Sequence, residues 1–181
     1  MAARRKAAPA ALEVDVQYAA DGAAGLPATR AVEAWVAGAL AGRRAGAQLT
    51  VRIVGEAEGR ELNERYRGRS GPTNVLSFPF ETPELLQPPL LGDVVLCAPV
   101  VAREAAAQGK APEAHWAHLV VHGVLHLLGY DHEAAREAAA MEALETAILA
   151  SLGFPDPYAA EMPAAPSRRR TESPKKTRRD Q

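Results

Sequence analysis

Residues 115–132 read HWAHLVVHGVLHLLGYDH and contain all 5 histidines of the protein. The pattern predicts a helix over about Glu113–Leu128, and Gly129 follows at the place where a left-handed residue commonly ends a helix. His122 and His126 are four residues apart, so on a helix they project from one face. This stretch therefore predicts a helix that brings two imidazoles together and then lets the chain fold back at Gly129.

The sequence on either side alternates strand and helix patterns. Leu12, Val14 and Val16 alternate with polar residues, as in a half-buried strand, and apolar residues recur at helical spacing between Pro27 and Gly42. Further strands are predicted at residues 49–54, 75–78 and 94–97, and further helices at about 56–66, at about 133–152 and from Pro99 onward. The alternation predicts an α/β (α+β) domain with a small mixed sheet of about four strands packed by helices, with the histidine-rich stretch at a helix and the turn after it.

Composition and charge divide the 181 residues into one domain with an extension at each end. We predict a basic N-terminal extension at residues 1–9, the domain at 10–158, and a disordered tail at 159–181 that is rich first in Pro and Ala and then in Arg and Lys. The net charge is −1; the first six residues contribute +3 and residues 168–181 contribute +5, which leaves −9 for residues 7–167. An acidic body with basic ends is more typical of an enzyme with a polycationic tail than of a basic nucleic-acid-binding fold.

Several features bear on the compartment of the protein. No uninterrupted apolar run approaches the roughly 20 residues that a membrane span requires, which excludes a membrane protein. The basic N-terminus has no apolar stretch behind it, so no secretory signal is predicted. Cys97 is the only cysteine and has no partner within the chain. These features predict a cytoplasmic location.

The histidine spacing predicts a metal site. His132 follows Gly129 by three residues, so the complete pattern is His-x-x-x-His-x-x-Gly-x-x-His, in which a turn at Gly129 delivers His132 to the ion held by His122 and His126. Three imidazoles with a fourth position left for water are typical of a catalytic zinc site, which predicts one Zn²⁺ per chain. Two alternatives remain, because His118 and His122 are also four residues apart and because imidazole also suits nickel, copper and iron.

Residue 123 argues against one class of zinc enzyme. The same ligand spacing occurs in metzincin-type metalloproteases, which have a glutamate directly after the first histidine as the general base. Here that position is Gly123, which cannot accept a proton. His115 and His118, taken one at a time, are each interpreted as a packed core residue rather than a ligand.

Three blocks of the sequence resemble the bacterial rRNA maturation factor and single-strand endoribonuclease family called YbeY. They are His122–His132 (HGVLHLLGYDH), residues 62–67 (LNERYR) followed by 72–79 (PTNVLSFP), and residues 91–95 (LGDVV). They occur in the order found in that family, and the resemblance spans about residues 10–153. The Arg- and Lys-rich tail after residue 167 lies outside the family pattern.

The resemblance implies a function and a set of site residues. It implies a hydrolase that cleaves single-stranded RNA in rRNA maturation, including 3′-end processing of small-subunit rRNA, and in ribosome quality control. Its partners would be rRNA precursors, the small ribosomal subunit and assembly factors. The implied zinc ligands are His122, His126 and His132, and the implied catalytic residues are His122 and Arg67, whose guanidinium can stabilise charge on a phosphodiester.

Other residues of these blocks have two interpretations each. Asn74 either contacts substrate or serves the turn after Pro72, Asp93 either orients a loop or lies near the site, and Asp131 either supports a ligand imidazole or caps the next helix. Two other functions also stay open. One is a zinc peptidase or amidase, which the ligand spacing favours and Gly123 opposes; the other is a non-catalytic ribosome assembly factor with a structural zinc.

Overall fold

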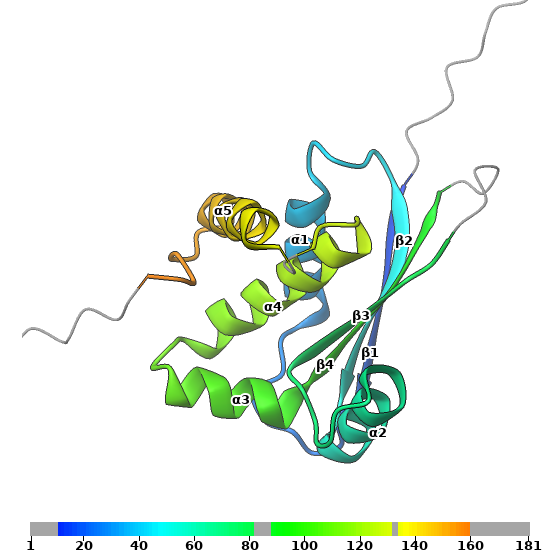
Figure 1. Ribbon diagram of the computed structural model, residues 1–181, viewed down its shortest axis with the longest axis vertical. Helices are drawn as coiled ribbons and strands as arrows, with labels where there is room; N and C mark the ends of the chain where they lie inside the picture. The colour runs from blue at the N-terminus through cyan, green and yellow to red at the C-terminus, as the bar shows by residue number, and fades with distance from the viewer. Residues whose placement is uncertain (1–10, 82–87, 132–133, 160–181) are drawn as a thin grey trace, which may run out of the picture.

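Four strands form one sheet in the part of the chain that the computed structural model describes, which is residues 11–81, 88–131 and 134–159 (Figure 1). The strands are β1 (Leu12–Ala19), β2 (Ala47–Val54), β3 (Val75–Pro79) and β4 (Leu90–Cys97). Their order across the sheet is β1-β2-β4-β3. β1, β2 and β4 are parallel, and β3 pairs antiparallel with β4, so the predicted mixed sheet is confirmed.

The two central strands, β2 and β4, carry the apolar face of the sheet. Along β2, Leu49, Val51 and Ile53 are buried and alternate with half-buried polar residues. Val51 pairs with Val16 of β1 and with Val94 of β4. Because a slip of one residue would turn the apolar side chains to the other face, this burial fixes the register of the three strands.

Helices cover both faces of the sheet. They are α1 (Thr29–Leu40), α2 (Glu56–Arg67), α3 (Ala98–Ala107), α4 (Pro112–Leu127) and α5 (Ala135–Ser151). Figure 1 shows α1, α4 and α5 on one side of the sheet and α2 on the other. The main core lies on the side of α1, α4 and α5, and a smaller apolar cluster lies on the side of α2, formed by Val54, Leu76, Val95 and Cys97.

α4 is the central helix of the main core. It contacts α1, α3 and α5 as well as β3 and β4. Its buried side chains include Trp116, Val120, Val124 and Leu125, and the burial of each such side chain contributes about 1.5–3 kcal/mol. These contacts fix the rotation of α4 about its axis, and the rotation determines where its histidines lie.

Gly123 lets α4 approach the sheet closely. A Cβ atom at this position would lie 2.5 Å from Cγ1 of Val94 and 3.3 Å from Oγ of Ser77. The Ser77 hydroxyl donates a hydrogen bond to the carbonyl oxygen of Gly123 at 3.1 Å, which ties β3 to α4 at the same place. Gly123 therefore faces the sheet, and a glutamate there has no room for its side chain.

Every strand and helix predicted from the sequence is present, and most boundaries agree within two residues. α5 begins at Ala135 and its N-cap position is Ala134, so the helix starts two residues later than the sequence predicts. The predicted extension at residues 1–9 and nearly all of the predicted tail lie outside the described residues, which begin at Ala11 and end at Ala159. Among the helices of the described ranges, none combines the length and the apolarity that crossing a bilayer would take.

Candidate metal centre

The second half of α4 brings His122 and His126 together. Their Nε2 atoms lie 3.1 Å apart, and their ring centroids are separated by 4.6 Å. Two imidazole nitrogens bound to one tetrahedral zinc at 2.0–2.1 Å would lie about 3.3 Å from each other. The predicted convergence of this helical pair is therefore present, at a separation that suits one shared ion.

The end of α4 has the predicted turn. Gly129 has a φ of 92°, which L side chains rarely adopt. The amide of Tyr130 donates to the carbonyl of Leu125 at 3.1 Å, the hydrogen bond of a Schellman motif that reverses the chain after a helix. His132, the predicted third ligand, lies outside the described residues, so its place in the site stays a prediction.

Glu145 of α5 is the centre of a hydrogen-bond cluster beside the two histidines. Its side chain is completely buried, and its Oε1 accepts a hydrogen bond from Nδ1 of His122 at 2.6 Å. Its Oε2 accepts hydrogen bonds from Nε2 of His118 at 3.1 Å and from the hydroxyl of Tyr158. Three donors from α4 and from the segment after α5 thus converge on one carboxylate.

These contacts set the charge of the cluster. Burial by itself raises the pKa of Glu145, but the hydrogen bonds from His118, His122 and Tyr158 outweigh it and lower this pKa to about 2. Burial, together with the neighbouring carboxylate, raises the pKa of Tyr158 far above its usual range. Glu145 is therefore an ionised acceptor at neutral pH, and Tyr158 is a neutral donor.

His118, His122 and Glu145 form the one group of three or more potential metal ligands found among the described residues, with ligand atoms within 4.8 Å of one another. The alternative helical pair, His118 and His122, is therefore also brought together, here with a carboxylate. The 2.6 Å between Nδ1 of His122 and Oε1 of Glu145 is shorter than the roughly 3.3 Å between two ligand atoms on a tetrahedral zinc. This separation suits a hydrogen bond between the two atoms.

His115 lies in a separate buried network, as the packing interpretation predicts. Its Nε2 is 2.9 Å from Oε2 of Glu104, and Glu104 also accepts hydrogen bonds from the side-chain amide of Asn74. Burial lowers the pKa of His115, although the hydrogen bond to Glu104 opposes this. Asn74 also accepts a hydrogen bond from the amide of Val75, so it serves the turn into β3, as one of its two interpretations predicts.

Arg67 is the last residue of α2 and is exposed. α2 covers the face of the sheet opposite to α4, with the edge strand β3 between the two helices (Figure 1). The loop after Arg67 leads directly into β3, whose Ser77 contacts α4. Arg67 therefore ends a helix that covers the opposite face of the sheet from α4, and the described contacts do not join it to the histidine pair.

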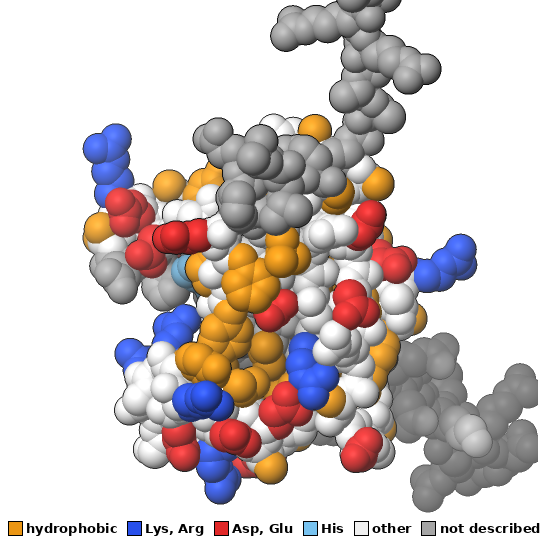
Figure 2. Space-filling view, turned by 90° about the vertical axis from the view of Figure 1, so that its right-hand side faces the viewer, with side chains coloured by type: hydrophobic (Ala, Val, Ile, Leu, Met, Phe, Trp, Pro, Cys, Tyr) orange, Lys and Arg blue, Asp and Glu red, His pale blue; other side chains and the backbone are white. Residues whose placement is uncertain are grey.

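The α2 side of the sheet also carries a pocket of about 420 Å³ lined by aromatic and charged side chains, including Arg52, Tyr66, Phe78, Phe80 and Asp93. Figure 2 shows hydrophobic side chains gathered on this face among Lys, Arg, Asp and Glu. Asp93 thus lines a pocket on the α2 side of the sheet, and its interpretation as a residue near the site stays a prediction.

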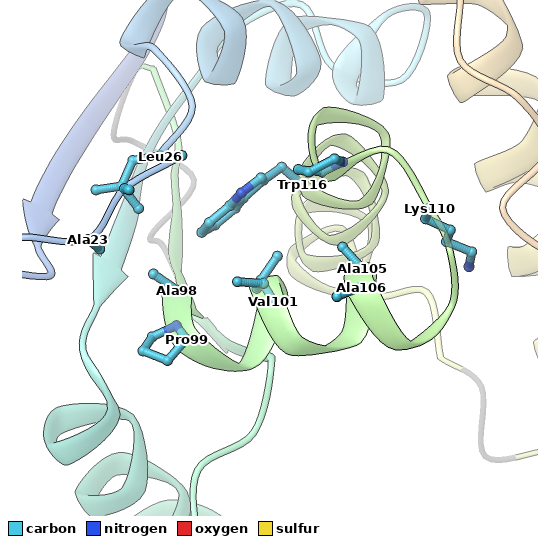
Figure 3. Close-up of a pocket in the computed structure, with 13 residues that line it drawn as sticks. Ala23, Leu26, Ala98, Pro99, Val101, Ala105, Ala106, Lys110 and Trp116 are labelled. Carbon is cyan, nitrogen blue, oxygen red and sulfur yellow. The ribbon is translucent and has the colours of Figure 1, made fainter.

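Another groove, also of about 420 Å³, lies between residues 23–26, α3 and Trp116 (Figure 3). Apart from Lys110, its lining residues have apolar side chains or none. Such a lining offers packing surface and no catalytic group, so this groove is separate from the metal centre.

Sequence reasoning missed Glu145 and Tyr158. A signal for Glu145 is present in α5, whose buried residues are Met141, Glu145, Ile148 and Leu149. Their spacing of four, three and one is that of an apolar helix face, and one of its four members is a carboxylate. An ionisable residue on a buried stripe requires partners from another element.

The family model described as "Endoribonuclease YbeY" matches residues 26–153 of the chain. The chain belongs to the YbeY endoribonuclease family. "Endoribonuclease YbeY" from Alkalilimnicola ehrlichii is 63% identical to it over 152 residues, which is 82% of this chain and 92% of that protein. The protein of the same name from Pseudomonas putida W619 is 60% identical over 149 residues, 82% of this chain and 94% of that protein.

The fold also resembles a solved structure. The solution structure of TM1509 from Thermotoga maritima matches with a TM-score of 0.50 and 22% sequence identity, over 80% of this chain and 99% of that one. This likeness bears on the fold alone and agrees with the predicted α/β class. The YbeY family assignment confirms the predicted enzyme class, which is a hydrolase acting as an endoribonuclease.

Proposed function

We propose that the protein is a zinc-dependent endoribonuclease with one zinc ion held by His122, His126 and His132. The observation that carries this proposal is the 3.1 Å separation of the Nε2 atoms of His122 and His126. Because His122 uses Nδ1 to donate to Glu145, its lone pair is on Nε2, the atom on the side of His126. Zinc is preferred because three imidazoles and an open fourth position are typical of catalytic zinc sites.

Zinc at this place would supply Lewis-acid stabilisation of a phosphoryl oxygen and activation of water. The chain contributes the orientation of the ligands, since packing fixes α4 against the sheet and Glu145 holds the ring of His122. Arg67 is proposed to neutralise charge on the phosphate through its planar guanidinium. An RNA strand that passes over the edge strand β3 would reach the histidines on one side and Arg67 on the other.

We infer that the substrate is single-stranded RNA, with rRNA precursors as the biological target and the small ribosomal subunit and its assembly factors as partners in the cytoplasm. Membership of a family named for endoribonuclease activity supports RNA as the substrate. The basic tail at residues 168–181 supports a polyanionic partner, because Lys and Arg side chains release counterions from phosphates. Processing of the 3′ end of small-subunit rRNA is the specific step proposed.

The test combines metal analysis with cleavage of single-stranded RNA, duplex RNA and casein by the same zinc-loaded protein. We expect one zinc per chain, cleavage of single-stranded RNA, little cleavage of the duplex and none of casein. The steric exclusion of a side chain at Gly123 argues against peptide hydrolysis through a glutamate at that position. Zinc binding without RNA cleavage would favour the non-catalytic assembly factor, and casein cleavage would favour the peptidase.

A further inference from the structure

A completely buried carboxylate needs a reason to be retained in a core. Taking an ion such as Glu145 out of water costs several kcal/mol, and this cost is offset only when its oxygens are well hydrogen-bonded. Oε1 of Glu145 is hydrogen-bonded by His122, and Oε2 by His118 and Tyr158. The carboxylate thus contacts Nδ1 of His122, which is one histidine of the proposed zinc pair.

The hydrogen bond between His122 and Glu145 selects one tautomer of the imidazole. An ionised carboxylate only accepts hydrogen bonds, so the 2.6 Å contact places a proton on Nδ1 of His122. In the neutral ring the other nitrogen, Nε2, then carries the lone pair. This is the atom that lies 3.1 Å from Nε2 of His126.

We propose that Glu145 is a positioning residue for the metal centre: it fixes the tautomer and the ring orientation of His122 and raises the basicity of its Nε2. This inference rests on the proposed function, because it takes His122 and His126 as ligands. A carboxylate behind a metal-bound histidine commonly acts in this way. His118, the remaining helical histidine of the cluster, contacts Glu145 through Nε2 and so supports the carboxylate instead of binding the ion.

The segment after α5 completes the support. The hydroxyl of Tyr158 donates to Oε2 of Glu145, and the ring of Tyr158 packs edge-on against that of His118. Oδ1 of Asp156 anchors this segment by accepting from the hydroxyl of Thr146 and from the amide of Tyr158. Lys110 donates a further hydrogen bond to the carbonyl of Pro157. Tyr158 is thereby held over the carboxylate.

The first measurement is the tautomer of His122 in the metal-free full-length protein, read from long-range ¹H–¹⁵N correlation spectra. We expect the proton on Nδ1 in the unmodified protein, and a mixture of tautomers in Glu145→Leu. A proton on Nε2 of His122 in the unmodified protein would by itself overturn the proposal, whatever the variants show.

The second measurement is zinc affinity, determined by competition with a chromophoric chelator. Glu145→Gln keeps an acceptor oxygen for Nδ1 but loses the charge, so we expect one zinc per chain with affinity about 10- to 100-fold weaker. Glu145→Asp, which keeps the charge on a shorter side chain, is expected to lie in between. The matched control is Glu142→Gln on the exposed face of the same helix, which should bind zinc as the unmodified protein does.

Two results would overturn the positioning role. One is unchanged zinc affinity in Glu145→Gln. The other comes from X-ray absorption spectra of the zinc-loaded proteins. If the metal has a carboxylate oxygen ligand in the unmodified protein and loses it in Glu145→Gln, Glu145 is itself a ligand. A protein that binds zinc tightly through His122 and His126 but cleaves no RNA would contradict the proposed function while leaving the positioning role intact.

Discussion

A Cβ atom at Gly123 would lie 2.5 Å from Cγ1 of Val94, across the contact between α4 and the sheet. Val94 is fully buried in β4, and its β-branched side chain has few allowed χ1 rotamers, so it cannot easily move away from an added Cβ atom. The position that lacks the metzincin base is thus also the position at which the fold requires the smallest residue. The close contact with Val94 therefore explains why position 123 has no carboxylate, and the consequence is that the metzincin general base is missing.

Gly123→Ala should therefore destabilise the protein, by about 1–3 kcal/mol, as is usual for overpacking in a core. Helix propensity alone would favour alanine by about 1 kcal/mol, so a loss of stability identifies the clash as the dominant effect. Urea unfolding of Gly123→Ala, Val94→Ala and the double variant measures the coupling. Gly123→Ala should lower the free energy of unfolding less in the Val94→Ala background than in the unmodified protein. Strictly additive changes in this free energy would contradict the clash.

Removal of a proposed ligand should abolish stoichiometric metal binding. We expect His122→Ala, His126→Ala and His132→Ala each to lose the tightly held ion, because two imidazoles and water hold zinc far more weakly than three. His115→Ala is the control, since His115 contacts Glu104 and not the histidine pair. Elemental analysis of the purified variants decides the assignment, and His132→Ala with one ion per chain would remove His132 from the ligand set.

Arg67→Ala should separate catalysis from metal binding. The side chain is exposed, so metal content should be unchanged and stability should change by no more than about 1 kcal/mol. Cleavage of single-stranded RNA should fall about 100-fold or more, the size of effect expected when one transition-state donor is removed. Arg67→Lys should recover part of the rate, because an ammonium keeps the charge but not the bidentate geometry.

Metal content and cleavage rate are to be measured on the same Arg67→Ala sample. Full activity would reduce Arg67 to a surface arginine, whereas lost metal would give it a structural role.

Deletion of residues 168–181 should leave folding and zinc content unchanged and weaken RNA binding. The segment carries seven basic and two acidic side chains, so its contacts with phosphates would release counterions. Affinity measured over a range of salt concentrations should show a flatter dependence in the truncated protein. An equal slope in both proteins would show that the tail does not contact RNA.

His115 should make the protein less stable at mildly acidic pH. Burial lowers its pKa in the folded protein, so the unfolded chain binds the additional proton first as the pH falls below about 6.5. The folded state therefore loses stability as the pH decreases from there toward the folded pKa. His115→Gln keeps a donor for Glu104 but does not titrate.

The check is urea unfolding of both metal-free proteins at about pH 8 and about pH 5.5, on either side of the ordinary histidine pKa. The stability of the unmodified protein relative to His115→Gln should be lower at the acidic pH. A difference that does not change with pH would show that the pKa of His115 is the same in the folded and unfolded states.

Local features of the chain were predicted well from the sequence, because they depend on residues close to one another. The separation of His122 and His126 by four residues places them on one face of any α-helix, and Gly129 permits the left-handed turn that ends α4. The same holds for the strand patterns of β1 and β2, in which alternation alone marks the buried face. The three sequence blocks that resemble the YbeY family also predicted the enzyme class correctly.

Tertiary structure alone decided which distant residues meet. The sheet order β1-β2-β4-β3 and the placement of α2, which ends at Arg67, on the other face of the sheet from α4 depend on packing between segments far apart in sequence. Glu145 comes behind His122 because Met141, Ile148 and Leu149 turn one face of α5 into the core, which carries the carboxylate between them to α4. Helical periodicity can indicate that such a residue is buried, but only the docking of α5 on α4 determines which group it contacts.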